Sequence, residues 1–188
     1  TTVVGQILNG CGIGEAGEGY LFDKDKYKNF MMRINQSVGK NISIGFFGYS
    51  GREIIIPYLI GPLISNIRMY GPDITIDLDE KLIINGQFVR RTDSRVDAGG
   101  FPGDVQQDVV TSGAFTEVIY APKGDMSKWY LTGLFNWVES DYNSLDYTSA
   151  TLHAGYLLRR NMRVVAEFTQ VFRDDPYGKV NVGVSTAF

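Results

Sequence analysis

Large apolar residues alternate with small or polar residues along most of this chain. In the last segment, residues 179–188, the valines 180, 182 and 184 share one face with Thr186 and Phe188. Successive side chains of a β-strand point to opposite faces, so this period of two predicts a strand with one apolar and one polar face. The same pattern predicts nine further strands. The ten expected strands are residues 2–8, 27–38, 42–49, 69–78, 82–91, 114–120, 129–141, 148–159, 162–173 and 179–188.

The connections between these strands alternate between long and short. Gly39–Asn41 and Asp79–Lys81 are short turns, whereas Asn9–Lys26, Ser50–Arg68 and Thr92–Gly113 are long. The apolar part of the second long connection, residues 50–66, contains two prolines, which cannot donate a ladder hydrogen bond. We therefore expect residues 50–66 to form an apolar loop, and residues 92–112 to form the longest polar connection.

The final segment, KVNVGVSTAF, resembles the C-terminal signature of bacterial outer-membrane β-barrels, which ends in Phe with apolar residues at alternate positions before it. The resemblance implies one domain, residues 1–188, folded as a transmembrane antiparallel up-and-down β-barrel of about ten strands in a bacterial outer membrane. It also implies that Val180, Val182, Val184 and Phe188 form the signal read by the barrel-assembly machinery. Long and short connections alternate in such barrels as well. Whether strands precede Thr1, which would make this the C-terminal part of a larger barrel, stays open.

Aromatic residues fit the interface girdles of such a barrel. Trp129 and Trp137 share one face eight residues apart, or about 26 Å along a strand. Tilted by about 40°, this distance spans roughly 20 Å of depth, close to the ~25 Å apolar band of outer-membrane barrels. The alternative is that the two rings pack in the core of a soluble β-sandwich. The expected girdle residues are Trp129, Trp137, Tyr156, Phe172 and Phe188.

The opposite, polar face carries many charged residues. The expected lumen-lining residues are Arg33, Asp77, Gln87, Arg91, Glu117, Asn136, His153, Arg159, Arg163, Glu167 and Arg173. Burying charges costs free energy unless they are paired or hydrated. In a closed ten-stranded barrel they would form a paired plug, for example Arg163 with Glu167. In a wider barrel they would line an aqueous pore whose mixed charges predict weak ion selectivity.

Composition excludes several other classes of protein. The formal net charge of −3 and the isoelectric point near 5.2 argue against a nucleic-acid partner. A mean hydropathy of −0.10 and the lack of a run of ~18 apolar residues argue against a helical membrane protein. The single cysteine, Cys11, excludes an internal disulfide framework.

Candidate catalytic and metal-binding motifs are weak. Gly12–Gly17 matches GxGxxG, but no helical pattern follows it, so a loop is expected rather than a dinucleotide site. The one histidine, His153, is about 13 Å along the strand from Ser149, too far for a hydrolytic pair. The acidic pairs and clusters Asp23/Asp25 and Asp77/Asp79/Glu80 lack a full set of cation ligands. We expect no enzymatic activity, no cofactor and no metal.

The sequence therefore predicts a porin-like channel or passive conduit whose main partner is the lipid bilayer. A second hypothesis is a structural barrel that sheathes or anchors a partner protein without conducting ions. The apolar segment Ile54–Ile64 is the expected contact for such a partner, because exposed apolar patches mark interaction sites. A third hypothesis is a soluble β-sandwich binding module.

Overall fold

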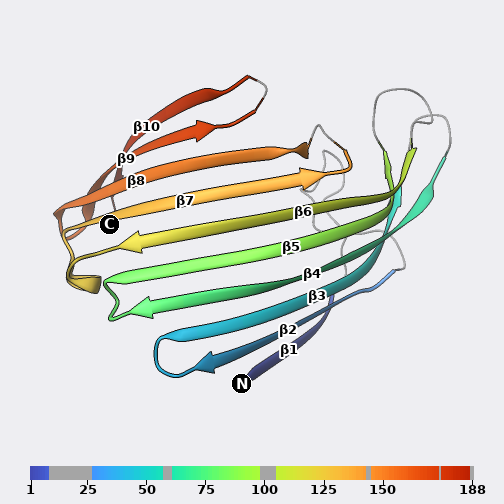
Figure 1. Cartoon of the computed structure of the whole chain (residues 1–188), viewed down its shortest axis with the longest axis horizontal. Coiled ribbons are helices and arrows are strands. Elements are labelled where there is room, and N and C mark those ends of the chain that lie inside the picture. The colour runs from blue at the N-terminus through green and yellow to red at the C-terminus, as the bar shows by residue number, and fades with distance from the viewer. Residues whose placement is uncertain (9–26, 57–60, 98–104, 143–144, 174, 187–188) are drawn as a thin grey trace.

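The computed structural model describes residues 1–8, 27–56, 61–97, 105–142, 145–173 and 175–186. Within these ranges the chain is all-β, with ten described strands and one described 3₁₀ helix, η1 (Gly124–Met126) (Figure 1). The strands are β1 (Thr2–Leu8), β2 (Asn29–Val38), β3 (Ile42–Ile55), β4 (Leu63–Leu78), β5 (Leu82–Asp97), β6 (Val105–Tyr120), β7 (Trp129–Ser140), β8 (Tyr147–Arg159), β9 (Met162–Val171) and β10 (Tyr177–Thr186).

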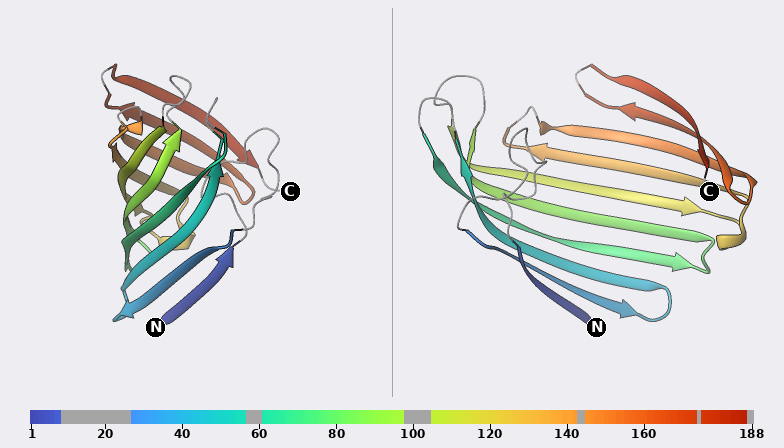
Figure 2. Two further views of the ribbon diagram at one scale, coloured as in Figure 1. Left: turned by 90° about the vertical axis from the view of Figure 1, so that its right-hand side faces the viewer. Right: turned by 180° about the vertical axis from the view of Figure 1, so that it is seen from behind.

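All ten strands form one antiparallel sheet in which each strand pairs with its neighbours in sequence. The last strand pairs with the preceding one as the sequence predicts, from Tyr177 opposite Val171 to Thr186 opposite Met162. Among the described residues, β1 and β10 are the two edges and do not pair with each other. The sheet is therefore strongly curved but open, rather than closed within the described strands (Figure 2).

The up-and-down order places the connections alternately at two ends of the sheet. Residues 39–41, 79–81, 121–128 and 160–161 connect strands at one end, called here the turn end. The opposite end, at which β1, β3, β5, β7 and β9 finish, is called the loop end (Figure 1). The expected alternation of long and short connections is only partly present. Residues 56–62 and 98–104 are shorter than expected, and residues 121–128 at the turn end include η1.

Residues 50–66 do not form the expected apolar loop. β3 continues to Ile55 and β4 begins at Leu63, so Ile54 lies directly opposite Ile64 in a hairpin. Pairing with the neighbouring strand decides this conformation, since residues 50–55 of β3 lie opposite residues 63–68 of β4 and their isoleucines suit a pleated surface. Pro62 directly precedes β4 and so does not interrupt it, and Pro57 lies outside the described residues.

The prediction of a polar connection over residues 92–112 is also wrong for most of that range. β5 continues to Asp97 and β6 begins at Val105, with Arg95 opposite Gln107. Polar side chains support this extension, since Ser65 Oγ on β4 donates a 2.7 Å hydrogen bond to the Arg95 carbonyl oxygen. Polarity alone therefore does not mark a loop where a neighbouring strand supplies backbone partners.

β4 contains a proline, Pro72, although it is a central strand. Pro72 lies opposite Phe46 on β3, while the ladder to β5 passes from Tyr70–Arg90 to Asp73–Gln87 without a pair at Gly71 or Pro72. Proline has no N–H for that ladder, which explains the interruption. A Cβ at Gly71 would be 1.8 Å from the Phe88 carbonyl oxygen, so only glycine fits this close approach of two backbones.

The two faces of the sheet differ in polarity and in burial. Every strand contributes apolar residues to one face, and Val180, Val182 and Val184 on β10 are 64–74% exposed there. The buried side chains lie on the other face, including a small cluster of Tyr49, Ile67 and Met69. Burial on this face indicates that the sheet curves around it. We call it the inner face, and the apolar one the outer face.

Candidate functional site: the polar inner face

The register places nine of the eleven expected lumen residues on the inner face. Cross-strand pairs fix this assignment, such as His153 opposite Glu167 and Asn136 opposite Ser149. The nine are Arg33, Asp77, Gln87, Arg91, Glu117, Asn136, His153, Arg163 and Glu167.

The other two expected lumen residues lie at the ends of strands. Arg159 lies at a register shift next to the 160–161 turn. Arg173 follows β9; its guanidinium donates to the Asp146 carbonyl oxygen and lies over the Tyr147 ring at 5.8 Å. Arg173 therefore ties the β7–β8 connection to β9 instead of projecting from the middle of the face.

An ion pair crosses one strand near the β1 edge of the inner face. Arg33 Nη2 on β2 donates to Asp73 Oδ1 on β4 at 2.7 Å, passing over β3. Gly45 on β3 makes this contact possible, because a Cβ there would be 2.4 Å from Asp73 Oδ2. That buried oxygen has no hydrogen-bond partner among the described residues.

Polar side chains of adjacent strands continue this pattern across the sheet. Ser43 Oγ donates to Asn35 Oδ1 at 2.6 Å. Two strands further along, Thr75 Oγ1 donates to Asn85 Oδ1 at 2.9 Å, and Asn85 Nδ2 donates to Glu117 Oε2 at 2.8 Å. The result is two short rows of hydrogen-bonded side chains, one between β2 and β3 and one across β4, β5 and β6.

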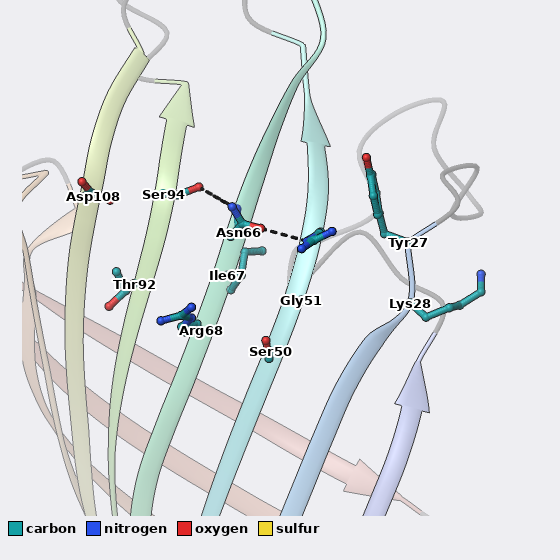
Figure 3. Close-up of a pocket in the computed structure, with 11 residues that line it drawn as sticks. Tyr27, Lys28, Ser50, Gly51, Asn66, Ile67, Arg68, Thr92, Ser94 and Asp108 are labelled. Carbon is teal, nitrogen blue, oxygen red and sulfur yellow. Dashed lines mark hydrogen bonds between the residues drawn. The ribbon is translucent and has the colours of Figure 1, made fainter.

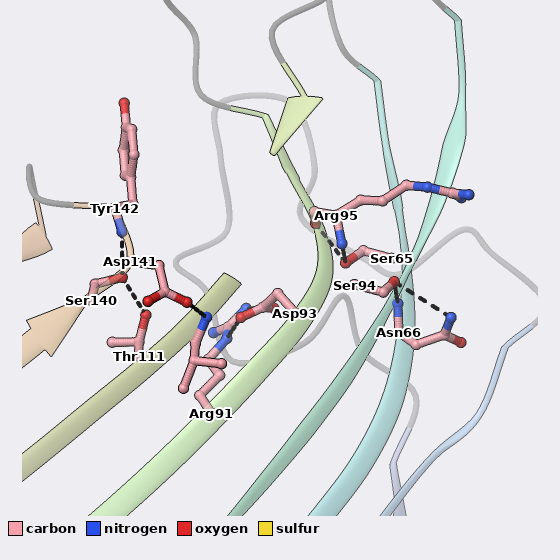
Figure 4. Close-up of polar contacts among 11 residues, drawn as sticks. Ser65, Asn66, Arg91, Asp93, Ser94, Arg95, Thr111, Ser140, Asp141 and Tyr142 are labelled. Carbon is pink, nitrogen blue, oxygen red and sulfur yellow. Dashed lines mark hydrogen bonds and ion pairs between the residues drawn. The ribbon is translucent and has the colours of Figure 1, made fainter. Parts of the chain in front are cut away.

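A second ion pair lies nearer the loop end, on the part of β5 that extends beyond the apolar outer residues. Arg91 Nε and Nη2 donate to the two carboxylate oxygens of Asp93, each at 2.6 Å (Figure 4). Burial by itself lowers the pKa of Arg91, but the hydrogen bonds and charge of Asp93 outweigh it and raise the pKa above its usual value. This guanidinium is therefore a fixed positive charge.

The strands near the β10 edge carry a hydrogen-bonded row of four residues. The Tyr130 hydroxyl lies 3.0 Å from His153 Nε2, and His153 Nδ1 lies 3.4 Å from Glu167 Oε2. Asn181 Nδ2 donates to the other Glu167 oxygen, Oε1, at 3.1 Å. The row joins β7, β8, β9 and β10 across the inner face.

The expected pairing of Arg163 with Glu167 is wrong. The Arg163 guanidinium lies over the Tyr130 ring at 5.2 Å, while Glu167 accepts from Asn181 and contacts His153. Four residues along one strand separate the two side chains by about 13 Å, so the neighbouring strands supply closer partners. Sequence reasoning does not single out Tyr130 or Asp93; only the cross-strand register brings them to these partners.

The aromatic residues of the outer face lie at both ends of β7. Trp129 is directly opposite Tyr156, and its ring contacts Tyr120 edge-on at 5.8 Å, at the turn end. Trp137 lies towards the loop end opposite Thr148, whose carbonyl oxygen accepts from the backbone N–H of Phe172. Four of the five expected girdle residues are thus divided between the two ends, and Phe188 lies outside the described residues.

The geometry does not strengthen the candidate catalytic and metal-binding motifs. Ser149 contacts Asn136 Nδ2 at 3.4 Å, and the two nitrogens of His153 face Tyr130 and Glu167. The Asp77 carboxylate accepts from the Glu80 backbone N–H at 2.8 Å, within a tight turn. Gly12–Gly17, Cys11 and Asp23/Asp25 lie outside the described residues. Within the described ranges, no group of three or more His, Cys, Asp or Glu residues is placed to hold a metal ion.

Comparisons with protein-family models, curated proteins and solved structures gave no significant match. In the part of the chain that the structure describes, no helix has the length and apolar character needed to cross a membrane. The two faces of the sheet therefore carry the functional information in this structure.

Proposed function

We propose that this chain forms part of the wall of a porin-like channel in a bacterial outer membrane. In this proposal the outer face contacts lipid and the inner face lines water. The observation that carries it is the apolar outer face, with exposed residues such as Phe46, Phe135 and Val182 on strands across the sheet. Soluble proteins rarely expose apolar patches larger than a few hundred Å². Lipid is the partner that would cover all strands of one face at once.

The two groups of outer aromatic residues support the same proposal. Trp129 and Trp137 lie eight positions apart on one strand, about 26 Å along it. Aromatic girdles border the ~25 Å apolar band of outer-membrane barrels at both interfaces. The spacing is therefore compatible with one girdle at the turn end and one at the loop end.

The inner face favours a conduit over a solid plug. Its ion pairs and hydrogen bonds run along the sheet between near neighbours, as in Arg33–Asp73 and His153–Glu167. A plug needs side chains that meet across a narrow lumen. Because the inner face carries both signs of charge, we expect weak ion selectivity.

Planar-bilayer recording tests this function. We expect the full chain, refolded in detergent and added to a bilayer, to produce discrete conductance steps. Heat-modifiable migration on a gel, measured on the same preparation, reports whether a barrel has formed. A preparation that shows heat-modifiable migration and inserts into lipid but stays electrically silent would contradict the channel function. The barrel fold would still be supported.

A structural role as an anchor for a partner protein is the second candidate. Ile54, Ile56 and Ile64 are exposed at the loop end of the β3–β4 hairpin, beyond the polar outer residues Ser50 and Arg68. Apolar side chains that lie past the interface suit a protein contact better than a lipid contact. Silence in bilayers together with loss of a bound partner in an Ile54→Ser/Ile64→Ser variant would favour this role.

A further inference from the structure

Basic residues lie immediately beyond the apolar part of the outer face, towards the loop end. On β4, Arg68 is the next outward residue after Tyr70, and on β5, Arg90 is the next after Phe88. Lys28, just before β2, is likewise the next outward residue after Phe30. Arg52 lies on β3. We call these four residues, Lys28, Arg52, Arg68 and Arg90, the basic patch.

A hollow of about 710 Å³ lies on this part of the outer face. Its lining includes three members of the basic patch, Lys28, Arg52 and Arg68, together with the polar groups of Ser50 and Thr92 (Figure 3). Asp108 is the one acidic residue of this lining. The hollow therefore combines an excess of positive charge with neutral hydrogen-bonding groups.

Two guanidinium groups of the patch are available to a ligand. Arg68 lies directly opposite Thr92, so it is the diagonal neighbour of Arg90, and such positions are roughly 7–8 Å apart. Both arginines are exposed, and neither guanidinium makes a hydrogen bond or an ion pair with another described residue. Arg52, in contrast, donates from Nε to Asn66 Oδ1 at 3.1 Å and lies over the Tyr27 ring at 5.8 Å.

The chemistry of the patch fits phosphate. A guanidinium presents a planar fork of N–H donors that matches phosphate oxygens, and two of them within reach can hold one phosphate group together. The position of the patch next to Tyr70 and Phe88 suits a phosphate that is attached to an acyl chain.

We propose that the basic patch binds the phosphate groups of anionic lipid headgroups in the membrane leaflet at the loop end. This inference rests on the proposed function, because it requires the outer face to contact lipid. Arg68 and Arg90 hold the phosphate, Arg52 adds charge, and the hollow accommodates the rest of the headgroup.

Lipid titration of the full chain in neutral-detergent micelles tests the proposal. The probes are short-chain phosphatidic acid and phosphatidylcholine with the same chains. We expect phosphatidic acid to bind more tightly, and the Arg68→Gln/Arg90→Gln variant to lose about tenfold or more in affinity for it. The matched control, Lys40→Gln/Lys81→Gln, removes the same charge at the turn end and should bind like the unaltered chain.

Two results would overturn the proposal. One is equal affinity of the arginine variant and the lysine variant for phosphatidic acid. The other is displacement of the lipid by inorganic phosphate at similar concentrations, which would mark an anion site with no preference for lipid.

Conductance separates this proposal from the proposed function. If the arginine variant loses lipid affinity while its conductance steps persist, both proposals are supported. If the unaltered chain conducts and the arginine variant binds lipid normally, only the lipid site fails. If the chain never conducts but its lipid affinity depends on Arg68 and Arg90, the channel fails and the lipid site stands.

Discussion

The ring of Tyr130 on β7 lies across Gly155 on β8, so closely that a Cβ at position 155 would be 2.2 Å from the ring atom Cε1. The same ring stacks against His153, with centroids 5.6 Å apart, and lies under the Arg163 guanidinium. Gly155 thus provides the space in which side chains from three strands meet on the inner face.

Gly155→Ala should displace the Tyr130 ring and separate its hydroxyl from His153. We expect a loss of about 1–3 kcal/mol in the free energy of unfolding, the usual cost of added volume in a packed site. Denaturant unfolding of the refolded chain measures this loss. Gly133→Ala is the matched control, because a Cβ there would meet nothing within 4 Å. Equal stability of the two variants would show that Tyr130 moves aside without cost.

Adjacent positions of β10 test which face contacts lipid. Val182→Arg places a charge on the outer face and should cost roughly 2–4 kcal/mol if the site lies near the bilayer midplane. Asn181→Arg introduces the same residue on the inner face, opposite Glu167, where an ion pair can form. We expect Val182→Arg to impair insertion into liposomes and Asn181→Arg to insert normally, as measured by co-flotation with lipid. The reverse order would contradict the assignment of the faces.

The two tryptophans should report the two membrane interfaces. Trp129→Phe and Trp137→Phe each leave a single tryptophan, since the chain contains two. In bilayers with brominated lipids, both variants should be quenched more by bromine near the headgroup than by bromine near the chain end, because girdle residues sit at the interface. Stronger quenching of either tryptophan from the bilayer centre would contradict the proposed girdles.

Asp73→Asn should shift the ion preference of the proposed channel towards anions. The substitution removes a negative charge from the inner face and leaves Arg33 without its carboxylate partner. Reversal potentials in a salt gradient measure the shift. Asp79→Asn is the control, because it changes the charge equally in the turn at residues 79–81, at a positive φ of 55° that Asn tolerates. An equal shift in both variants would show that Asp73 has no special place in the lumen.

Much of the strand order follows from the sequence. Alternation along residues 162–173 and 179–188, with a short connection between them, predicts the hairpin of β9 and β10 that the structure contains. The period of two also separates Trp129 and Trp137 from Asn136, because the side-chain direction along a strand depends only on local backbone geometry. The longer strands were missed at residues 50–55 and 92–97. Their pairing depends on neighbours rather than on their own pattern.

The sequence by itself determined which residues face outward and which face inward, because that property is local and repeats every two residues. Only the tertiary structure decided which inner residues meet, since a pair such as Arg33 and Asp73 depends on the register of three strands and on the missing side chain of Gly45 between them. The openness of the sheet is likewise a property of the whole. It depends on how twist and curvature accumulate over ten strands, and no single segment encodes that sum.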